Sequence, residues 1–587
     1  MKQLFIAVSL ISLFAGCNNN SEPTSSTASP SSDTAFQKIA DEYLNGYFAA
    51  RPLYAVALGF HEGYDGKTSD YSKASLDAEL NRMKSFDAKL SALDTAGLNK
   101  QNFMDYRLLR SSIKNEIFNI EDEHIYTKNP MQYAGAIDVN TYVKRNFAPL
   151  EERVKYIIST ENALPALFTA AKTNLQDSLP KPYIETAIQM AEGNKSFLKG
   201  DLLTALKELK NDSLMAAFKR SNDTAIKAYD DFVQWLTKEK LPKATNQYAI
   251  GKDNYKKMLL YSEGITMEPE QILAIGLQQL KTEQDEFNAA AKIINPNKKP
   301  IDVFHDLQND HPSADSLIPV AKQHLESIRQ FLIDHKICSI PSDVRVQIKE
   351  TPQYARSTST ASMDVAGPFE KNATESYYYI TPVDTKWNAK QKEDWLRQFD
   401  YYSTDNITIH EAYPGHYMQG LHLNASGASK IQKIFGSYAF TEGWAHYCEK
   451  MMVEEGYGGK DSVTAAKHRI AMSGDALLRI CRLCVSIKMH CQGMTIEEGT
   501  HFLMDNWYQG EKPSYQEALR GSFDPGYLFY TVGKLEILKL RNDYKQQEGS
   551  NFSLQKFNDA MMDNGMPPVI MLRELLLKDK AKWNEIL

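Results

Sequence analysis

The stretch NITIHEAYPGHYMQG, residues 406–420, holds two histidines and a glutamate in a pattern typical of metal sites. In a His-Glu-x-x-His helix, two imidazoles one turn apart bind Zn²⁺, and the glutamate beside them activates water. Here His416 follows His410 by six residues instead of four. Six residues of a regular helix correspond to a rotation of about 240° and a rise of about 9 Å, which would keep the two imidazoles apart. The motif therefore requires an interruption of the helix.

Pro414 and Gly415 supply that interruption. Proline lacks the N–H group of a helical hydrogen bond, and its ring would clash with the carbonyl group of His410, four residues earlier. Glycine tolerates backbone angles that other residues avoid. We therefore expect the chain to leave the helix here and to return His416 to the face of His410, with Glu411 as general base. The alternative is a plain helix break with surface histidines.

The segment SYAFTEGWAHYCEKMMVEEG, residues 437–456, contains the candidates for a third metal ligand. Glu442, His446 and Glu449 are spaced by four and three residues, so they share one face of a helix. Since catalytic zinc has three protein ligands and an open position, we expect Glu442 to complete the site. His446 and Glu449 would orient the ligands by hydrogen bonds. Two alternatives stay open: His446 replaces Glu442 as the ligand, or Glu442 only complements its helix dipole.

Together the two segments resemble the DUF885 family of bacterial proteins. They resemble more distantly the gluzincin metallopeptidases of the oligopeptidase and metal-dependent carboxypeptidase type. The resemblance rests on His410-Glu411-Ala-Tyr-Pro-Gly-His416 and on Thr441-Glu442-Gly-Trp-Ala-His446-Tyr, and it covers most of the chain after residue 35. It implies a mainly α, zincin-like body of two helical lobes, with Zn²⁺ at the bottom of a deep central cleft.

Two later elements extend the resemblance and imply further catalytic residues. The segment from Leu478 to His490 is similar to a family segment that ends in histidine, and Tyr530-Thr-Val-Gly533-Lys resembles a family Tyr-x-x-Gly element. The resemblance therefore implies that His490 and Tyr530 stabilise the oxyanion. The alternative for His490 is a buried histidine of the core. The family usually has aspartate where this chain has Ser486, which leaves the pairing made by that aspartate open.

A small β-sheet is expected just before the His-Glu motif. Residues 344–348 alternate between apolar and polar side chains, and residues 377–380 are aromatic and favour a strand. Residues 357–374 between them are expected to form a loop. The second strand would bind an extended peptide by edge pairing, through Tyr377, Tyr378 and Tyr379. The alternative is that these tyrosines serve packing.

Residues 1–16 predict a secretory signal, because Lys2 precedes an apolar run of 12 residues that is too short to span a bilayer. Ala15 and Gly16 before Cys17 resemble the lipobox of bacterial lipoproteins, which implies that Cys17 carries a lipid. Residues 17–35 then form a polar, flexible tether. We expect an exported lipoprotein anchored in the cell envelope, at the outer membrane or on the periplasmic side. The alternative is an ordinary signal peptide with an incidental cysteine.

The 587 residues exceed the size of a single hydrophobic core, which stops growing at about 250–300 residues. We expect an N-terminal helical lobe over residues 36–245 and a catalytic helical lobe over residues 246–587. The net charge of −7 shows no basic surplus of the kind that nucleic-acid binding requires. Three cysteines lie on one stripe of a predicted helix and are expected to pack in the core rather than to form a second zinc site: Cys481, Cys484 and Cys491.

These features predict a zinc-dependent peptidase that hydrolyses oligopeptides, with Glu411 as general base. One alternative is a metal-dependent amidohydrolase that acts on a non-peptide amide. Another is a helical lipoprotein that binds peptides without cleaving them. Glu411 argues against the second alternative, since a structural metal site needs ligands but no adjacent base.

Overall fold

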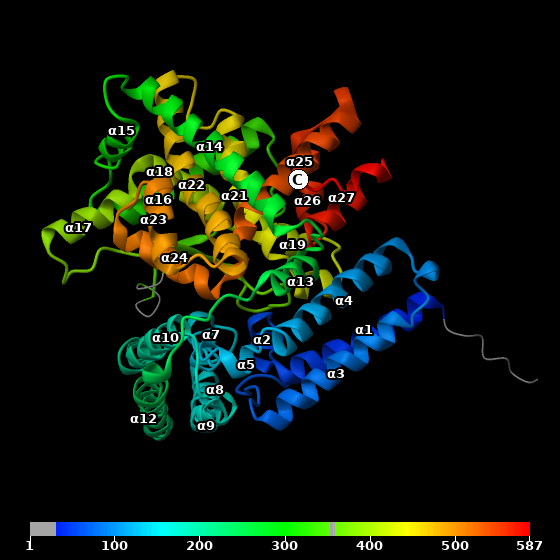
Figure 1. Cartoon of the computed structure of the whole chain (residues 1–587). Coiled ribbons are helices and arrows are strands. Elements are labelled where there is room, and N and C mark those ends of the chain that lie inside the picture. Colours follow the sequence, from blue (N-terminus) through cyan, green and yellow to red (C-terminus); the bar gives the residue numbers. More distant parts are fainter. Residues whose placement is uncertain (1–30, 353–355, 357–358) are drawn as a thin grey trace, which may run out of the picture.

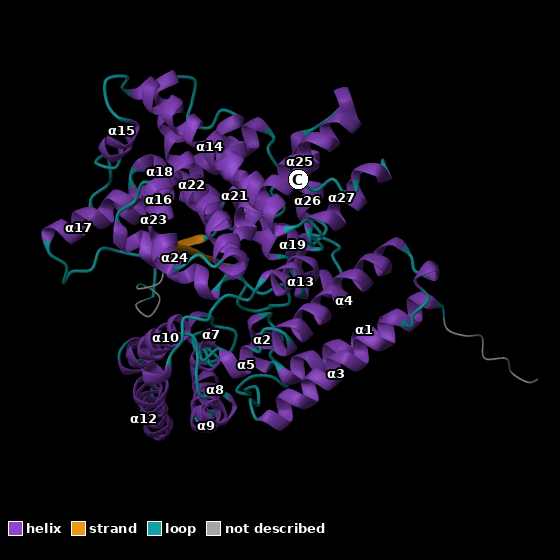
Figure 2. Cartoon of the chain, in the orientation of Figure 1, coloured by secondary structure: helices purple, strands orange, loops and turns teal. Residues whose placement is uncertain are grey.

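The computed structural model describes residues 31–352, 356 and 359–587. Within these residues the protein is mainly helical, with 70% helix and a three-stranded sheet, so the predicted mainly α class with a small sheet is confirmed (Figure 2). The predicted signal peptide and Cys17 lie outside the described residues. None of the described helices combines the length and the apolar composition that crossing a membrane requires.

Three N-terminal helices lie side by side along one edge of the molecule (Figure 1): α1 (Ser32–Ala50), α3 (Lys73–Ser91) and α4 (Lys100–Glu121). The side chain of Ser31 accepts a hydrogen bond from the backbone N–H of Thr34, so it caps α1. Because α1 begins at Ser32, the tether predicted to end at residue 35 is too long by four residues. Buried side chains of these helices, Tyr43 and Phe86 among them, share a core with the C-terminal half of the chain.

A second group of helices has a hydrophobic core of its own, and it lies together in Figure 1: α8 (Leu150–Glu161), α9 (Leu164–Asn174), α10 (Lys181–Lys199) and α12 (Asp212–Trp235). The residues of this core come mainly from 133–236. The expected lobe of residues 36–245 is thus divided between two cores. Helical periodicity shows that a helix has an apolar face, but it does not show which helix will cover that face.

The sheet consists of β1 (Gln347–Glu350), β2 (Ala361–Asp364) and β3 (Tyr377–Ile380) in the order β1-β3-β2. β1 runs parallel to β3 and β2 runs antiparallel to it. The strand at 377–380 is confirmed, and the strand expected at 344–348 lies slightly later. The segment 357–374, expected to be a loop, contains β2, whose residues Ala-Ser-Met-Asp have little intrinsic strand preference.

The position of β3 corrects one expectation about peptide binding. Both edges of β3 are already paired, so an extended peptide cannot add to it as another strand. All its side chains are buried, and the Tyr378 hydroxyl lies 3.3 Å from Thr408 Oγ1 on the helix that carries the His-Glu motif. The expected edge pairing is therefore wrong, and the tyrosines serve packing beside the site: Tyr377, Tyr378 and Tyr379.

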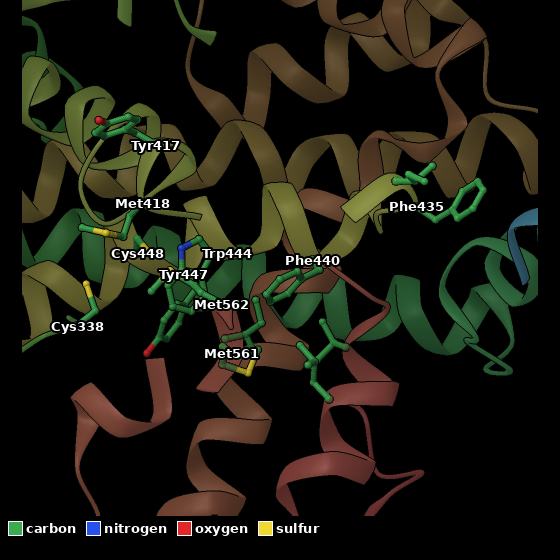
Figure 3. Packing of buried hydrophobic residues seen from close by; sticks show 14 of the residues in the cluster. Cys338, Tyr417, Met418, Phe435, Phe440, Trp444, Tyr447, Cys448, Met561 and Met562 are labelled. Atoms are coloured by element: carbon green, nitrogen blue, oxygen red, sulfur yellow. The ribbon is translucent and has the colours of Figure 1, made fainter. Parts of the chain in front are cut away.

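Five helices of the C-terminal half surround the His-Glu motif: α18 (Tyr401–Glu411), α19 (His416–Ala425), α21 (Tyr438–Glu454), α22 (Ser462–Gln492) and α25 (Phe529–Glu548). In the core, Trp444, Tyr447 and Cys448 of α21 lie together with Met561 and Met562 (Figure 3). On α22, Cys481 and Cys484 are buried and unpaired, as expected for packing.

A pair of glycines lets α21 and α25 touch backbone to backbone. A Cβ atom on Gly443 would lie 2.5 Å from Gly533, and a Cβ atom on Gly533 would lie 1.8 Å from the carbonyl oxygen of Ala439. This close crossing brings the Tyr530 ring, three residues before Gly533, to 5.7 Å from the ring of Tyr438 on α21.

We expect Gly533→Ala to lower the thermal unfolding midpoint, because the added methyl group forces α21 and α25 apart. Overpacking of this kind costs about 1–3 kcal/mol. The measurement is thermal unfolding followed by circular dichroism. Gly193→Ala in α10 is the matched control, since the Cβ it would add meets no described atom within 4 Å apart from the neighbouring backbone of its own helix. Equal midpoints for the two variants would contradict the backbone contact.

Candidate metal centre

The helix that carries the His-Glu motif is interrupted between the two histidines. α18 ends at Glu411 and α19 begins at His416, with residues 412–415 between them. The break is complete rather than a bulge within one helix. It brings the rings of His410 and His416 to 4.9 Å between centroids, at an interplanar angle of 88°. A Cβ atom on Gly415 would lie 1.8 Å from the carbonyl oxygen of His410, so this approach requires glycine.

Glu442 of α21 completes a group of three potential ligands. One ligand atom each of His410, His416 and Glu442 lies within 4.8 Å of the others, the only such group that the described residues offer. Glu442 Oε2 lies 3.6 Å from His410 Nε2 and 3.5 Å from His416 Nε2. This oxygen is buried and accepts no hydrogen bond from the described part of the chain. Two imidazole nitrogens and one carboxylate oxygen form a donor set that fits Zn²⁺.

Glu449, seven residues after Glu442 on α21, supports the first of these ligands. Its Oε1 lies 2.6 Å from His410 Nδ1 and 3.3 Å from Arg479 Nη2, and its Oε2 lies 3.2 Å from His446 Nδ1. Because the carboxylate accepts the proton of His410 Nδ1, Nε2 is the nitrogen of His410 that faces the other two candidate ligands.

His446 lies behind the three ligands rather than among them. Its Nδ1 contacts Glu449, and its Nε2 is buried without a hydrogen-bond partner in the described residues. Burial, followed by the positive charge of Lys534, lowers the pKa of His446 well below its ordinary range, so the ring is neutral. The geometry therefore favours Glu442 over His446 as the third ligand.

Opposite charges hold the three candidate ligands together. Burial alone would raise the pKa of Glu442, but the neighbouring imidazoles outweigh it and hold that pKa well below its ordinary value. Burial opposes a charge on His410, yet Glu442 and Glu449 raise the pKa of this histidine to about 10. The pKa of His416 is raised in the same way against burial, chiefly by Glu442. Such a buried carboxylate next to two imidazoles favours a bound cation.

Glu411 and Tyr530 border this group. Glu411 is half-buried at the end of α18, and it forms no hydrogen bond or ion pair with any residue that the structure describes. Its carboxylate is thus free to accept a proton from water. Burial, followed by the negative charge of Glu442, raises the pKa of Tyr530, so its phenol keeps its proton. The structure brings both residues to the side of the expected ligands.

His490 has a different role from the one that the sequence predicted. It is 1% exposed, its Nδ1 accepts the backbone N–H of Ile250 at 3.3 Å, and its Nε2 donates to the carbonyl oxygen of Gly521 at 2.8 Å. It lies eleven residues beyond Arg479 on α22, about 16 Å along the helix axis. The expected oxyanion role is therefore wrong, and His490 is a buried histidine of the core.

Ser486, where the family usually has aspartate, also serves packing. Its hydroxyl donates to the carbonyl oxygen of Pro525 at 2.7 Å and lies 2.8 Å from the Tyr255 hydroxyl. Sequence reasoning missed Asn406, whose amide donates to Asp475 at 2.6 Å and to Glu449 at 3.4 Å. Its position one helical turn before His410 is the signal that could have identified it.

The fold and the His-His-Glu group define a mainly helical protein with a candidate metal centre. The profile of the family described as "Bacterial protein of unknown function (DUF885)" matches residues 52–576, and the chain belongs to this family. Comparison with curated proteins gives no match.

Two solved structures share the fold. One is a candidate lipoprotein of unknown function from Shewanella oneidensis, with 24% identity and a TM-score of 0.77; the match covers 92% of this chain and 100% of that one. The other is a candidate lipoprotein from Colwellia psychrerythraea, with 16% identity and a TM-score of 0.77, covering 94% of this chain and 99% of that one. At these identities the similarity shows a common fold.

We expect Gly415→Ala to abolish stoichiometric zinc binding while the far-ultraviolet circular dichroism stays unchanged. The added Cβ would overlap the His410 carbonyl oxygen and move His416 away from His410. Zinc is measured by elemental analysis after dialysis. Gly427→Ala, in the loop after α19, is the control, because its Cβ would meet no heavy atom within 4 Å. Equal zinc content in the two variants would contradict this geometry.

We expect His490→Asn to reduce stability most at neutral pH. Burial lowers the pKa of His490 to about 4 in the folded protein, whereas the unfolded value is 6.5. The unfolded chain therefore gains a proton first as the pH falls, and about 3 kcal/mol of stabilisation is lost between the two values. In zinc-free protein, the difference in unfolding midpoint between wild type and variant should narrow from pH 7 to pH 4. A difference independent of pH would contradict a neutral buried ring.

Proposed function

We propose that the protein is a zinc-dependent hydrolase of peptide bonds, distantly related to the gluzincin peptidases. His410, His416 and Glu442 would hold the zinc ion, and Glu411 would act as general base. The observation that carries the proposal is the convergence of three ligand atoms beside the carboxylate of Glu411, which has no hydrogen-bond or ion-pair partner among the described residues. Zinc bound there would act as a Lewis acid and would lower the pKa of water to about 7.

The chain's own residues then have distinct tasks. Glu411 takes a proton from water and passes it to the leaving amine, which its freedom from other partners permits. Glu449 keeps the Nδ1 proton of His410 in place, at 2.6 Å, and so fixes the orientation of that ring. Tyr530 donates a hydrogen bond to the oxygen that becomes negative, because its raised pKa preserves the phenol proton.

The outer edge of β2 is the feature that supports binding of an extended peptide. The N–H of Thr381 donates to the carbonyl oxygen of Thr360, so hydrogen bonds to β3 come from residues 360, 362 and 364. The backbone of Met363 consequently faces away from β3, and β2 contacts α18. A peptide would add to this edge as a further strand. The proposal also includes a deep cleft between two helical lobes.

We further propose that Cys17 anchors the protein in the cell envelope through a lipid. The Ala-Gly-Cys sequence at residues 15–17 supports this placement. The two proteins with the same fold are themselves described as candidate lipoproteins.

Glu411→Gln tests the proposed chemistry. We expect this variant to keep one zinc ion per chain but to lose hydrolysis of a peptide library by a factor of about 10²–10⁴, the usual contribution of a general base. Hydrolysis is followed by mass spectrometry, which also locates the cleaved bond. Glu455→Gln, a glutamate on the exposed surface after α21, is the matched control and should retain full activity.

Three outcomes would count against this function. Wild-type protein without zinc would exclude the metal mechanism, and an active Glu411→Gln would exclude the general base. If zinc-loaded wild type binds peptides but cleaves only a non-peptide amide, the amidohydrolase alternative replaces the peptidase.

A further inference from the structure

Three arginines surround the ring of Tyr530. The guanidinium carbons of Arg479 and Arg482 on α22 lie 5.9 and 5.1 Å from the ring centroid, and that of Arg520 on α24 (Glu511–Phe523) lies 5.9 Å away. Guanidinium groups at such distances from an aromatic face are attracted to it and held in defined orientations.

Carboxylates hold two of these guanidinium groups through Nε and Nη2, and Nη2 of Arg520 also donates to the Tyr438 hydroxyl at 3.1 Å. Nε and Nη2 of Arg482 donate to Glu517 at 2.8 and 2.9 Å, and Nε and Nη2 of Arg520 donate to Asp524 at 3.0 and 2.9 Å. The Nη1 atoms of Arg482 and Arg520 form no hydrogen bond with any described residue, and the protein does not fully enclose them. Each Nη1 therefore reaches solvent-accessible space.

The cluster of Arg479, Arg482, Arg520 and Tyr530 borders the metal residues on two sides. Tyr438, which contacts Tyr530, is one helical turn before Glu442 on α21, so the two side chains share a face. Arg479 Nη2 lies 3.3 Å from Glu449 Oε1, the carboxylate that holds His410. A group bound at Tyr530 is thus next to the reacting bond of a peptide in the proposed site.

The donors that the cluster leaves unused favour an anion. Each arginine has a carboxylate beside it: Glu449 for Arg479, Glu517 for Arg482 and Asp524 for Arg520. The attraction therefore comes from the Nη1 groups of Arg482 and Arg520, which keep hydrogen-bond donors free, rather than from an excess of positive charge. Arginine forks match the geometry of carboxylates, with which they form strong charge-assisted hydrogen bonds.

We propose that Arg482 and Arg520, held around Tyr530, bind a carboxylate group of the substrate close to the scissile bond. The inference rests on the proposed function and adds a substrate class, peptides with a carboxylate next to the cleaved bond. That carboxylate is the free C-terminus of the peptide or the side chain of an aspartate or glutamate.

The test uses zinc-loaded Glu411→Gln protein, in which peptides can be bound without being cleaved. Fluorescence anisotropy gives the Kd of one labelled peptide in three forms: with a free C-terminal carboxylate, with a C-terminal amide, and with an amide after an added glutamate. We expect one of the two carboxylate forms to bind at least about tenfold more tightly than the plain amide, as charge-assisted hydrogen bonds imply. Which form it is identifies the source of the carboxylate.

Variants in the same background assign the effect to the cluster. Arg520→Gln should abolish the preference, whereas Arg469→Gln, at a half-buried arginine elsewhere on α22, should leave it intact. Equal Kd values for the three peptides would overturn the proposal, and so would a preference that survives in Arg520→Gln. The Kd values of the three peptides test the proposal even if Arg520→Gln does not fold.

The two proposals fail in different measurements. If wild type with bound zinc hydrolyses none of the three peptides but the Glu411→Gln protein still prefers the carboxylate forms, the hydrolase is excluded and the carboxylate site stands. If wild type hydrolyses all three peptides and the binding preference is absent, the hydrolase stands and the carboxylate site is excluded.

Discussion

The contact between the backbone of Gly415 and the carbonyl oxygen of His410 is the constraint on which the candidate centre depends. It ends α18 and starts α19 within four residues, and it turns a spacing that would separate two histidines into one that joins them. The indole of Trp444 donates to the carbonyl oxygen of Pro414 at 2.9 Å, so α21 is fixed to this linker. This hydrogen bond places Glu442, two residues before Trp444, beside the two histidines.

Residues of helix α21 contribute to every part of the site. Gly443 allows the backbone of α25 to approach, which places Tyr530 beside the ligands. One and two turns further along the helix, His446 and Glu449 form the buried hydrogen bonds behind His410. The sequence Glu442-Gly-Trp444-Ala-His446 therefore combines a candidate ligand, a helix contact, a linker contact and a supporting side chain, because successive residues of a helix face different neighbours.

The sequence predicts the helical class, the strand at 377–380 and the interruption at Pro414, since each follows from local periodicity or from backbone chemistry. It does not predict β2, whose residues form a strand only because β3 offers a partner. It also misassigns His490, because a resemblance in sequence does not show the partners of this ring, the backbone N–H of Ile250 and the carbonyl oxygen of Gly521. Tyr530 reaches the site through the crossing of α21 and α25, a contact that the Tyr-x-x-Gly element does not show. The position of Asn406 on α18 could be read from the sequence, but its partners Glu449 and Asp475 lie on other helices.

Anomalous diffraction at the zinc edge, from crystals of zinc-loaded protein, tests the central claim most directly. The account predicts one strong peak about 2.0–2.2 Å from His410 Nε2, from His416 Nε2 and from a carboxylate oxygen of Glu442. The absence of a peak between these residues would contradict it, and so would a peak bound by His446 in place of Glu442.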